Sequence, residues 1–421
     1  MWCPATLHRD DGMIRNIATL LTGNALSQLV NVVTILFVVT AYFTPAEFGR
    51  YAVAMSYVGI SSSVACFRYE LAIVAVGGKI AANNMVFASA IIATAFSALV
   101  FVTFTLFSLT VGDGFLVGTS PIVIATLILL KAVDQILASV LYRHEAYVSY
   151  SILKLVQAMV LLSGFAGAGL AGLGLDGLLL STMLAYASFA VTGMIAIRGY
   201  SLRSGVRYGR MVALLKRHVD FAKFNTPQAL IDNLLSNGLN FVLVVLAGPS
   251  VVGYFNYMQR ILKAPLGLIF GAVSQVVFRF SAKNAADPGL VTHKLRQIFA
   301  VVSAILLIAA SGVGLAYVFF ADLSFLKDWS GMRAYMIAFA VWMLVPFIFS
   351  PYATLPIVYG RQKQFFQLAT TFNLLSLLVL TLMIWTGSVV SAFWTVGLIS
   401  IVYFTGLNAW LFKVAGSGQE S

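Results

Sequence analysis

The sequence predicts an all-α polytopic membrane protein with about twelve transmembrane helices. Sixty per cent of the 421 residues are hydrophobic and only 10% are charged, whereas a soluble domain carries about 25% charged residues. The apolar residues form about twelve stretches, each close to the roughly 20 residues that a helix needs to cross a bilayer. These observations exclude a soluble protein, so the function is carried out within or across a membrane.

The hydrophobic stretches divide the chain into two lobes of six helices. We expect spans at 16–42, 49–67, 85–111, 120–142, 150–170, 176–197, 220–247, 250–279, 296–320, 332–358, 365–386 and 389–412. The expected domains are an N-terminal tail at 1–15, an N-lobe at 16–197, a basic linker at 198–219, a C-lobe at 220–413 and a C-terminal tail at 414–421. An even number of spans per half predicts a parallel pseudo-two-fold repeat.

Two similar segments support the repeat. Pro45–Tyr51 joins spans one and two, and Pro249–Tyr254 joins spans seven and eight. Both read Pro-x-x-x-Gly followed within two residues by an aromatic residue, and both occupy the same place in their halves.

The basic residues predict the orientation. Of the 26 Lys and Arg residues, twenty fall in loops on one side of the spans, and only Arg50, Lys327 and Arg333 fall on the other. The positive-inside rule therefore places both termini and the linker in the cytoplasm. Orientation, rather than binding to nucleic acid, accounts for the net charge of +12. The first twelve residues are polar, so no cleavable signal peptide is expected.

The linker allows two interpretations. Residues 207–218 have the composition of a basic amphipathic helix that lies on the anionic inner leaflet. A plain solvated linker is equally compatible with the sequence.

The motifs of common enzymes and metal proteins are absent from the sequence. Cys3 and Cys66 do not suggest a disulfide framework or a thiol redox motif. The histidines lie beside basic residues in connecting segments, and no cluster has metal-ligand spacing. We expect no cofactor, no metal site and no catalytic residues.

Two cations deep in span eight are the candidate cargo site. Arg260 and Lys263 share one helical face because they are three residues apart. Asp232 in span seven is also placed near the membrane midplane. Ionisable groups at this depth mark a transport pathway by default, so we expect a cationic cavity that receives a phosphate or pyrophosphate. The alternative is that Arg260 only pairs with Asp232.

Other polar groups in the spans have both structural and functional interpretations. Lys131 and Asp134 share a helical face and are expected to form an intramembrane ion pair with a structural role. Arg68 and Glu70, at the inner end of span two, suit either a salt-bridged gate or an interfacial anchor. Spans one and seven are rich in amides and hydroxyls, which hold helices together or line a cavity. We expect Asn24, Gln28 and Asn237 to line the cavity.

At these residues the chain resembles a known family. Leu21–Gln28, Pro45–Tyr51, Arg68–Ile73, Gly248–Tyr254 and Arg260–Leu266 are similar to segments of Wzx-like polysaccharide flippases in the multidrug/oligosaccharidyl-lipid/polysaccharide exporter superfamily. The likeness extends over residues 13–413. The chain departs from the family at Phe278–Phe280, where relatives commonly have a proline.

The resemblance implies a flippase that works by alternating access. Its cargo is an undecaprenyl-pyrophosphate-linked oligosaccharide, which moves from the inner to the outer leaflet of a bacterial cytoplasmic membrane for O-antigen, capsule or exopolysaccharide synthesis. A glycan polymerase of the same pathway is a possible partner. A cation-coupled drug exporter remains the nearest alternative, although it favours acidic cavity residues. A polytopic polymerase or ligase fits less well because its usual large outer loop is missing.

Overall fold

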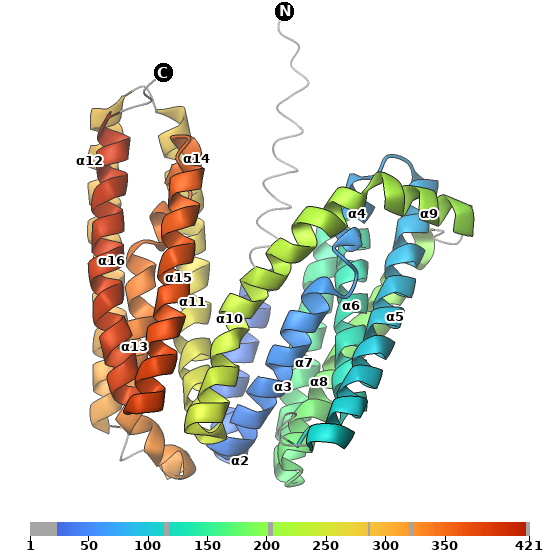
Figure 1. Cartoon of the computed structure of the whole chain (residues 1–421), viewed down its shortest axis with the longest axis horizontal. Coiled ribbons are helices and arrows are strands. Elements are labelled where there is room, and N and C mark those ends of the chain that lie inside the picture. The colour runs from blue at the N-terminus through green and yellow to red at the C-terminus, as the bar shows by residue number, and fades with distance from the viewer. Residues whose placement is uncertain (1–22, 113–117, 201–204, 285–286, 320–323, 418–421) are drawn as a thin grey trace, which may run out of the picture. The chain divides into compact units, whose positions relative to one another are not determined.

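The computed structural model describes residues 23–112, 118–200, 205–284, 287–319 and 324–417 (Figure 1). Within these ranges every regular element is helical, and eleven helices are long and apolar enough to cross a membrane. The count is twelve if a bent pair of helices, Pro45–Val64 and Tyr69–Ala75, forms one span. The predicted all-α fold with about twelve spans is therefore confirmed. The expected N-terminal tail at 1–15 lies outside the described residues.

The chain divides into two compact units, one up to Phe241 and one from Val242 onward. The division falls inside helix α10 (Thr226–Ala247) because the first part of α10 packs on the first unit. Asn240 donates a hydrogen bond of 2.8 Å to the buried Ser56 hydroxyl, and the rings of Tyr57 and Phe241 lie 4.6 Å apart. The expected lobes at 16–197 and 220–413, with a linker between them, stay a prediction.

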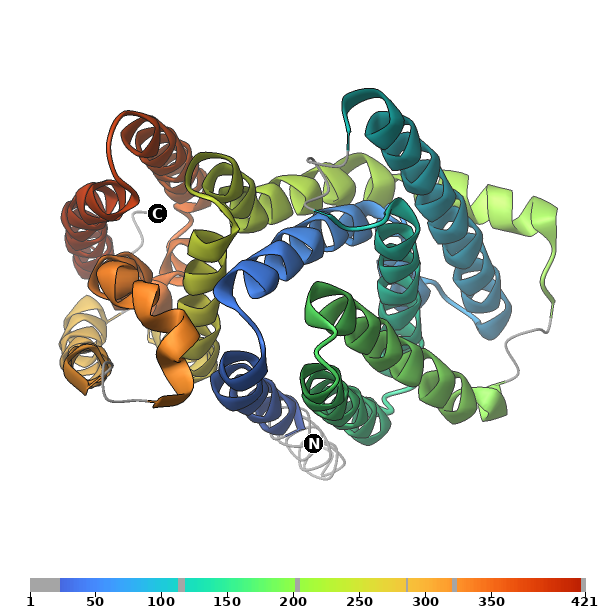
Figure 2. The same cartoon turned by 90° about the horizontal axis from the view of Figure 1, so that it is seen from below.

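The first unit begins with the span Gly23–Tyr42 and continues through seven further helices before α10. These are α3 (Pro45–Val64), α4 (Tyr69–Ala75), α5 (Lys79–Val111), α6 (Pro121–Arg143), α7 (Tyr147–Leu170), α8 (Gly174–Ala196) and α9 (Tyr208–Arg217). Helices α7 and α8 form an antiparallel pair, and α6 packs against α8 (Figure 2). The rings of Phe48, Phe165 and Phe189 are fully buried in this unit.

Both repeated sequence segments start a helix. Pro45 opens α3, where the Thr44 hydroxyl accepts from the Glu47 amide and Glu47 accepts from the Thr44 amide. Pro249 opens α11 (Pro249–Lys283) after Gly248, whose φ of +87° suits glycine. Proline fits the first turn because the amide hydrogen it lacks has no partner there.

Helix α9 shows that the linker is not a plain solvated chain. The Asn84 side chain on α5 donates to the Gly205 carbonyl at 3.1 Å and accepts from the Arg207 amide at 2.9 Å. The Tyr69 hydroxyl donates to the Leu215 carbonyl at 3.2 Å. These bonds fasten α9 to α4 and α5, while its contact with an anionic leaflet stays a prediction.

The second unit contains α11 to α16. After α11 come α12 (Pro288–Phe319), α13 (Arg333–Leu344), α14 (Leu355–Val358), α15 (Gln362–Thr386) and α16 (Val389–Ser417). The predicted span at 332–358 is broken after α13 into short 3₁₀ turns and α14. Pro346, Pro351 and Pro356 explain the breaks, because each lacks an amide hydrogen and crowds the preceding turn. The Trp329, Phe339 and Phe393 rings are fully buried in this unit.

Candidate functional site

The predicted gate pair lies at a sharp break in the second span. Arg68 Nη1 lies 3.4 Å from Glu70 Oε1, so the expected ion pair is present. Phe67 and Arg68 have φ values of +47° and +58°, a left-handed conformation that residues other than glycine rarely adopt. Helices α3 and α4 consequently meet at an angle of 49°. If the bent pair forms one span, the predicted span at 49–67 extends beyond this break to Ala75.

The charges at the break are incompletely satisfied. Glu70 is 3% exposed, and its Oε2 has no hydrogen-bond partner among the described residues; the same is true of Arg68 Nε. At the other end of α4, Arg143 donates to the Ile73 and Val76 carbonyls at 2.7 Å each. Strained backbone at such a position costs about 1–3 kcal/mol and is typical of segments that switch conformation. A gating role for Arg68 and Glu70 stays a prediction.

Asp134 is linked to a neighbouring helix through a glutamine. Its carboxylate is buried and accepts a 2.8 Å hydrogen bond from Gln157 Nε2 on α7. Gln157 Oε1 in turn accepts from Lys154 Nζ at 3.0 Å. In the described part of the chain no ion pair within 4.0 Å joins Lys131 to Asp134. The expected direct pair is therefore replaced, among the described residues, by a link from Lys154 through Gln157 to Asp134.

The sequence did not lead us to expect Lys154 and Gln157 in the hydrogen-bond network of Asp134. Lys154 lies on α7, within the span expected at 150–170, with its ammonium 4.6 Å from the centre of the Phe189 ring. The spacing of three residues between Lys154 and Gln157 was the available signal, since it places both side chains on one helical face.

Lys263 has a different environment on α11. Its ammonium lies 4.8 Å from the centre of the Trp342 ring of α13, in a cation–π contact. Lys263 makes no ion pair among the described residues. Arg260 is half-buried and precedes it by one turn on the same face of the helix. The predicted pair of deep cations therefore lies on one helix, and an aromatic ring supports one of them.

The remaining candidate residues differ in exposure. On the first span Asn24 is half-buried and Gln28 is exposed, and Asp232 on α10 is also exposed. Asn237 packs over Gly59 of α3 and donates to the Asn233 carbonyl at 3.1 Å. Asn237, like Asn240, therefore helps to hold α10 against α3. Asp232 and Arg260 belong to different units, so the alternative in which they pair stays a prediction.

The described residues suit binding of an anion. In that part of the chain no group of three or more His, Cys, Asp or Glu residues lies close enough to hold a metal ion. The deep groups of α11 are an ammonium and a guanidinium, and the polar groups of the first span are amides and hydroxyls. Such groups attract and hydrogen-bond an anionic, hydroxyl-rich molecule.

Comparison with known sequences gives one family match. A model described as polysaccharide biosynthesis protein matches residues 38–334, which is more than half of the chain and includes the Arg68–Glu70 pair and all of α11. No curated protein matches the chain in sequence.

Solved structures share the fold at low sequence identity. The lipid II flippase MurJ, in an inward closed conformation, has a TM-score of 0.62 at 14% identity and covers 94% of this chain and 89% of its own. An inward-facing multidrug resistance MATE family transporter of the MOP superfamily has a TM-score of 0.56 at 14% identity and covers 94% of each chain. At this identity the likeness shows the fold alone, which is that of MOP-superfamily transporters.

Proposed function

Because the chain belongs to the polysaccharide biosynthesis protein family and has the fold of MOP-superfamily transporters, we propose that it is a flippase for lipid-linked glycans. The proposed cargo is an undecaprenyl-pyrophosphate-linked oligosaccharide for O-antigen, capsule or exopolysaccharide synthesis. The cargo moves from the inner to the outer leaflet of the bacterial cytoplasmic membrane by alternating access, and the protein is not an enzyme. Both termini lie in the cytoplasm in this proposal.

Lys263 is the observation that carries the proposal. A membrane-embedded ammonium is costly unless it is paired or hydrated, yet Lys263 meets an indole ring and no carboxylate among the described residues. A pyrophosphate supplies the missing negative charge in the loaded state. Charge-assisted hydrogen bonds to such a group are about twice as strong as neutral ones.

The other candidate residues take secondary roles in this proposal. Arg260 contributes the planar, two-pronged donor that suits phosphate oxygens. Asn24, Gln28 and Asn237 offer amides to the sugars, and Asp232 balances Arg260 between cargo molecules. The Arg68–Glu70 pair opens and closes the cytoplasmic side, and a glycan polymerase receives the product. Because no P-loop is present, an ion gradient or the membrane potential supplies the driving force.

Reconstitution tests the function directly. The purified protein in liposomes should move a fluorescent lipid-linked oligosaccharide between leaflets, as measured by protection from a reagent that cannot cross the membrane. We expect Lys263→Ala to slow this movement by about 10- to 100-fold, which corresponds to one lost charged hydrogen bond. Lys263→Arg should retain part of the activity. Movement at the wild-type rate in Lys263→Ala would contradict the proposed site.

The same liposomes can test the alternative function, which is export of cationic drugs. Cationic drugs need acidic groups in the pathway, but the buried Asp134 is already engaged by Gln157 and Asp232 balances Arg260 in this proposal. The proposal therefore predicts no gradient-driven uptake of cationic dyes by the reconstituted protein. Uptake of dyes without movement of the lipid-linked glycan would show that the protein is a drug exporter and not a flippase.

A further inference from the structure

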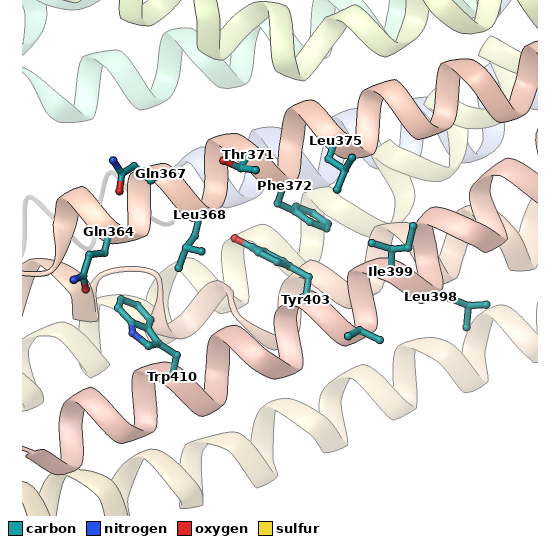
Figure 3. Close-up of a pocket in the computed structure, with 11 residues that line it drawn as sticks. Gln364, Gln367, Leu368, Thr371, Phe372, Leu375, Leu398, Ile399, Tyr403 and Trp410 are labelled. Carbon is teal, nitrogen blue, oxygen red and sulfur yellow. The ribbon is translucent and has the colours of Figure 1, made fainter.

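A groove of about 850 Å³ lies between α15 and α16 of the second unit (Figure 3). Its volume is near the upper end of the roughly 300–1,000 Å³ that is usual for ligand sites. Leucine, isoleucine, valine and aromatic side chains line most of it. The function proposed above leaves this groove without a role, since the deep cations lie on α11.

The groove changes character along its length. Gln364 and Gln367 lie at one end, next to Trp410, whereas Leu375 and Leu398 lie at the other. At 1.5 Å per residue, the distance from Gln364 to Leu375 is about 16 Å. That length is about half of the ~30 Å bilayer core. The groove is therefore long enough to follow one leaflet from its surface to the membrane midplane.

The polar end of the groove is also the basic end of both helices. Arg361 and Lys363 flank the start of α15, and Lys413 lies near the end of α16. None of the described residues that line the groove is acidic. The distribution of basic residues along the chain predicts that this end faces the cytoplasm. An anionic head group at the polar end thus matches the charge, and an apolar tail matches the remainder.

An aromatic pair joins the two helices of the groove, and an exposed glycine, Gly406, lies between the levels of Tyr403 and Trp410. The Phe372 and Tyr403 rings stack at 4.0 Å with planes 9° apart, which joins the two helices. Gly406 lies on the same face of α16 as Tyr403 and Trp410, because residues three and four apart are neighbours on a helix. A Cβ atom at Gly406 would meet no other atom within 4 Å. The missing side chain leaves space between the two aromatic residues.

We propose that the α15–α16 groove holds the polyisoprenoid tail of the lipid-linked substrate during loading from the inner leaflet, with the diphosphate at the Gln364 end. This inference rests on the proposed function. A polyisoprenoid diphosphate combines an anionic head with a long, methyl-branched apolar chain, and the groove offers basic, polar, aromatic and aliphatic surfaces in that order. The diphosphate then exchanges between this end and the Arg260–Lys263 pair while the tail stays in the groove, so both regions contribute to binding at equilibrium.

Filling the groove provides the test. Binding of undecaprenyl diphosphate and of inorganic pyrophosphate, which has no tail, is measured for the full chain in phosphatidylcholine nanodiscs. Gly406→Leu should weaken binding of the long-tailed probe by about tenfold, because it displaces roughly two buried methylene groups. Binding of inorganic pyrophosphate should not change. Gly312→Leu on α12 is the matched control, since a Cβ atom there also meets nothing within 4 Å.

Each other outcome overturns the inference. Unchanged binding of undecaprenyl diphosphate by Gly406→Leu, or an equal loss for both probes, would show that the tail does not occupy the groove. Persistent cross-linking of an acyl-labelled phosphatidylglycerol to Tyr403 in the presence of excess undecaprenyl diphosphate would make the groove a bulk-lipid contact. Leu398→Trp fills the groove from its other end and replaces Gly406→Leu if that variant does not fold.

The glycan movement assay separates the two proposals. If the wild-type protein moves the lipid-linked glycan and Gly406→Leu binds and moves it equally well, only the groove is rejected. If the wild-type protein binds the long-tailed probe through the groove but moves no glycan, the proposed function fails and the groove stands.

Discussion

Two lysines within the spans, one in each unit, have similar aromatic neighbours and different polar ones. Lys154 lies 4.6 Å from the centre of the Phe189 ring, and Lys263 lies 4.8 Å from that of Trp342. Lys154 also donates to Gln157, which bonds to the Asp134 carboxylate. Among the described residues Lys263 makes no ion pair and has no such link to a carboxylate. An aromatic ring alone thus does not distinguish the two lysines; the presence of an internal counter-charge does.

The comparison teaches how to separate a structural charge from a substrate-binding one. A buried cation with a carboxylate on a neighbouring helix has its charge balanced within the protein, so removing it weakens the fold. A buried cation without such a partner is balanced only by water or a ligand, so removing it affects transport more than folding. The Asp134 network and Lys263 should therefore respond to mutation in opposite ways.

The largest expected effect is loss of stability in Asp134→Ala. Lys154 would lose the buried carboxylate to which Gln157 links it, and removing one partner of a buried charged interaction costs up to roughly 3–5 kcal/mol. Thermal unfolding of the detergent-solubilised variant should show a clearly lower midpoint than that of the wild type. Asp134→Asn keeps the hydrogen-bonding shape and should lose less. An unchanged midpoint for Asp134→Ala would remove the structural interpretation of this network.

The second prediction concerns Arg260 in cells. Arg260→Ala should abolish export of the glycan while the protein still inserts, since one charged phosphate contact is worth about 1.5–3 kcal/mol. Arg260→Lys should retain part of the export. If Arg260 only neutralises Asp232, the double variant Arg260→Ala with Asp232→Ala should restore export. Such recovery, measured as surface polysaccharide, would reject Arg260 as a cargo residue.

A sequence without coordinates predicts the spans well because they depend on local hydropathy. Contacts between helices are harder to predict from the sequence. Nothing in the residues around Asp134 indicates that Gln157, on the next helix, donates a hydrogen bond to it. Lys263 and Trp342 lie far apart in the chain, so hydrophobic periodicity, which is a local pattern, does not predict their contact either. The break at Phe67 and Arg68 could not be predicted, because neither residue favours a left-handed backbone. By contrast, the prolines after α13 predict the breaks in the helix there.

The third prediction concerns the gate. Glu70→Gln keeps the shape of the side chain and removes the charge that pairs with Arg68 at 3.4 Å. We expect slower glycan movement, by about fivefold, if the ion pair helps to hold one conformation by roughly 1 kcal/mol. Protein abundance in the membrane should stay near that of the wild type. Loss of the protein from the membrane would instead indicate a folding role.

The smallest expected effect is a pH dependence at His144, which lies in the connection between α6 and α7. Its ring stacks on Tyr200 at 3.8 Å, and burial together with the nearby Arg143 and Lys79 charges lowers its pKa below the usual value. The unfolded chain therefore binds more protons as the pH falls below about 6.5. Stability should decrease slightly toward acid, and His144→Gln should remove part of that decrease. Identical acid profiles of the unfolding midpoint for both proteins would exclude this contribution.

Binding of head-group variants tests the central claim most directly. The claim is that the α11 cations recognise the diphosphate of a lipid-linked glycan. Wild-type protein in nanodiscs should bind undecaprenyl diphosphate more tightly than the monophosphate, and the monophosphate more tightly than undecaprenol. Lys263→Met keeps the apolar contact with Trp342 and should bind the diphosphate about tenfold more weakly, with little change for undecaprenol. An unchanged preference for the diphosphate in Lys263→Met would contradict the account.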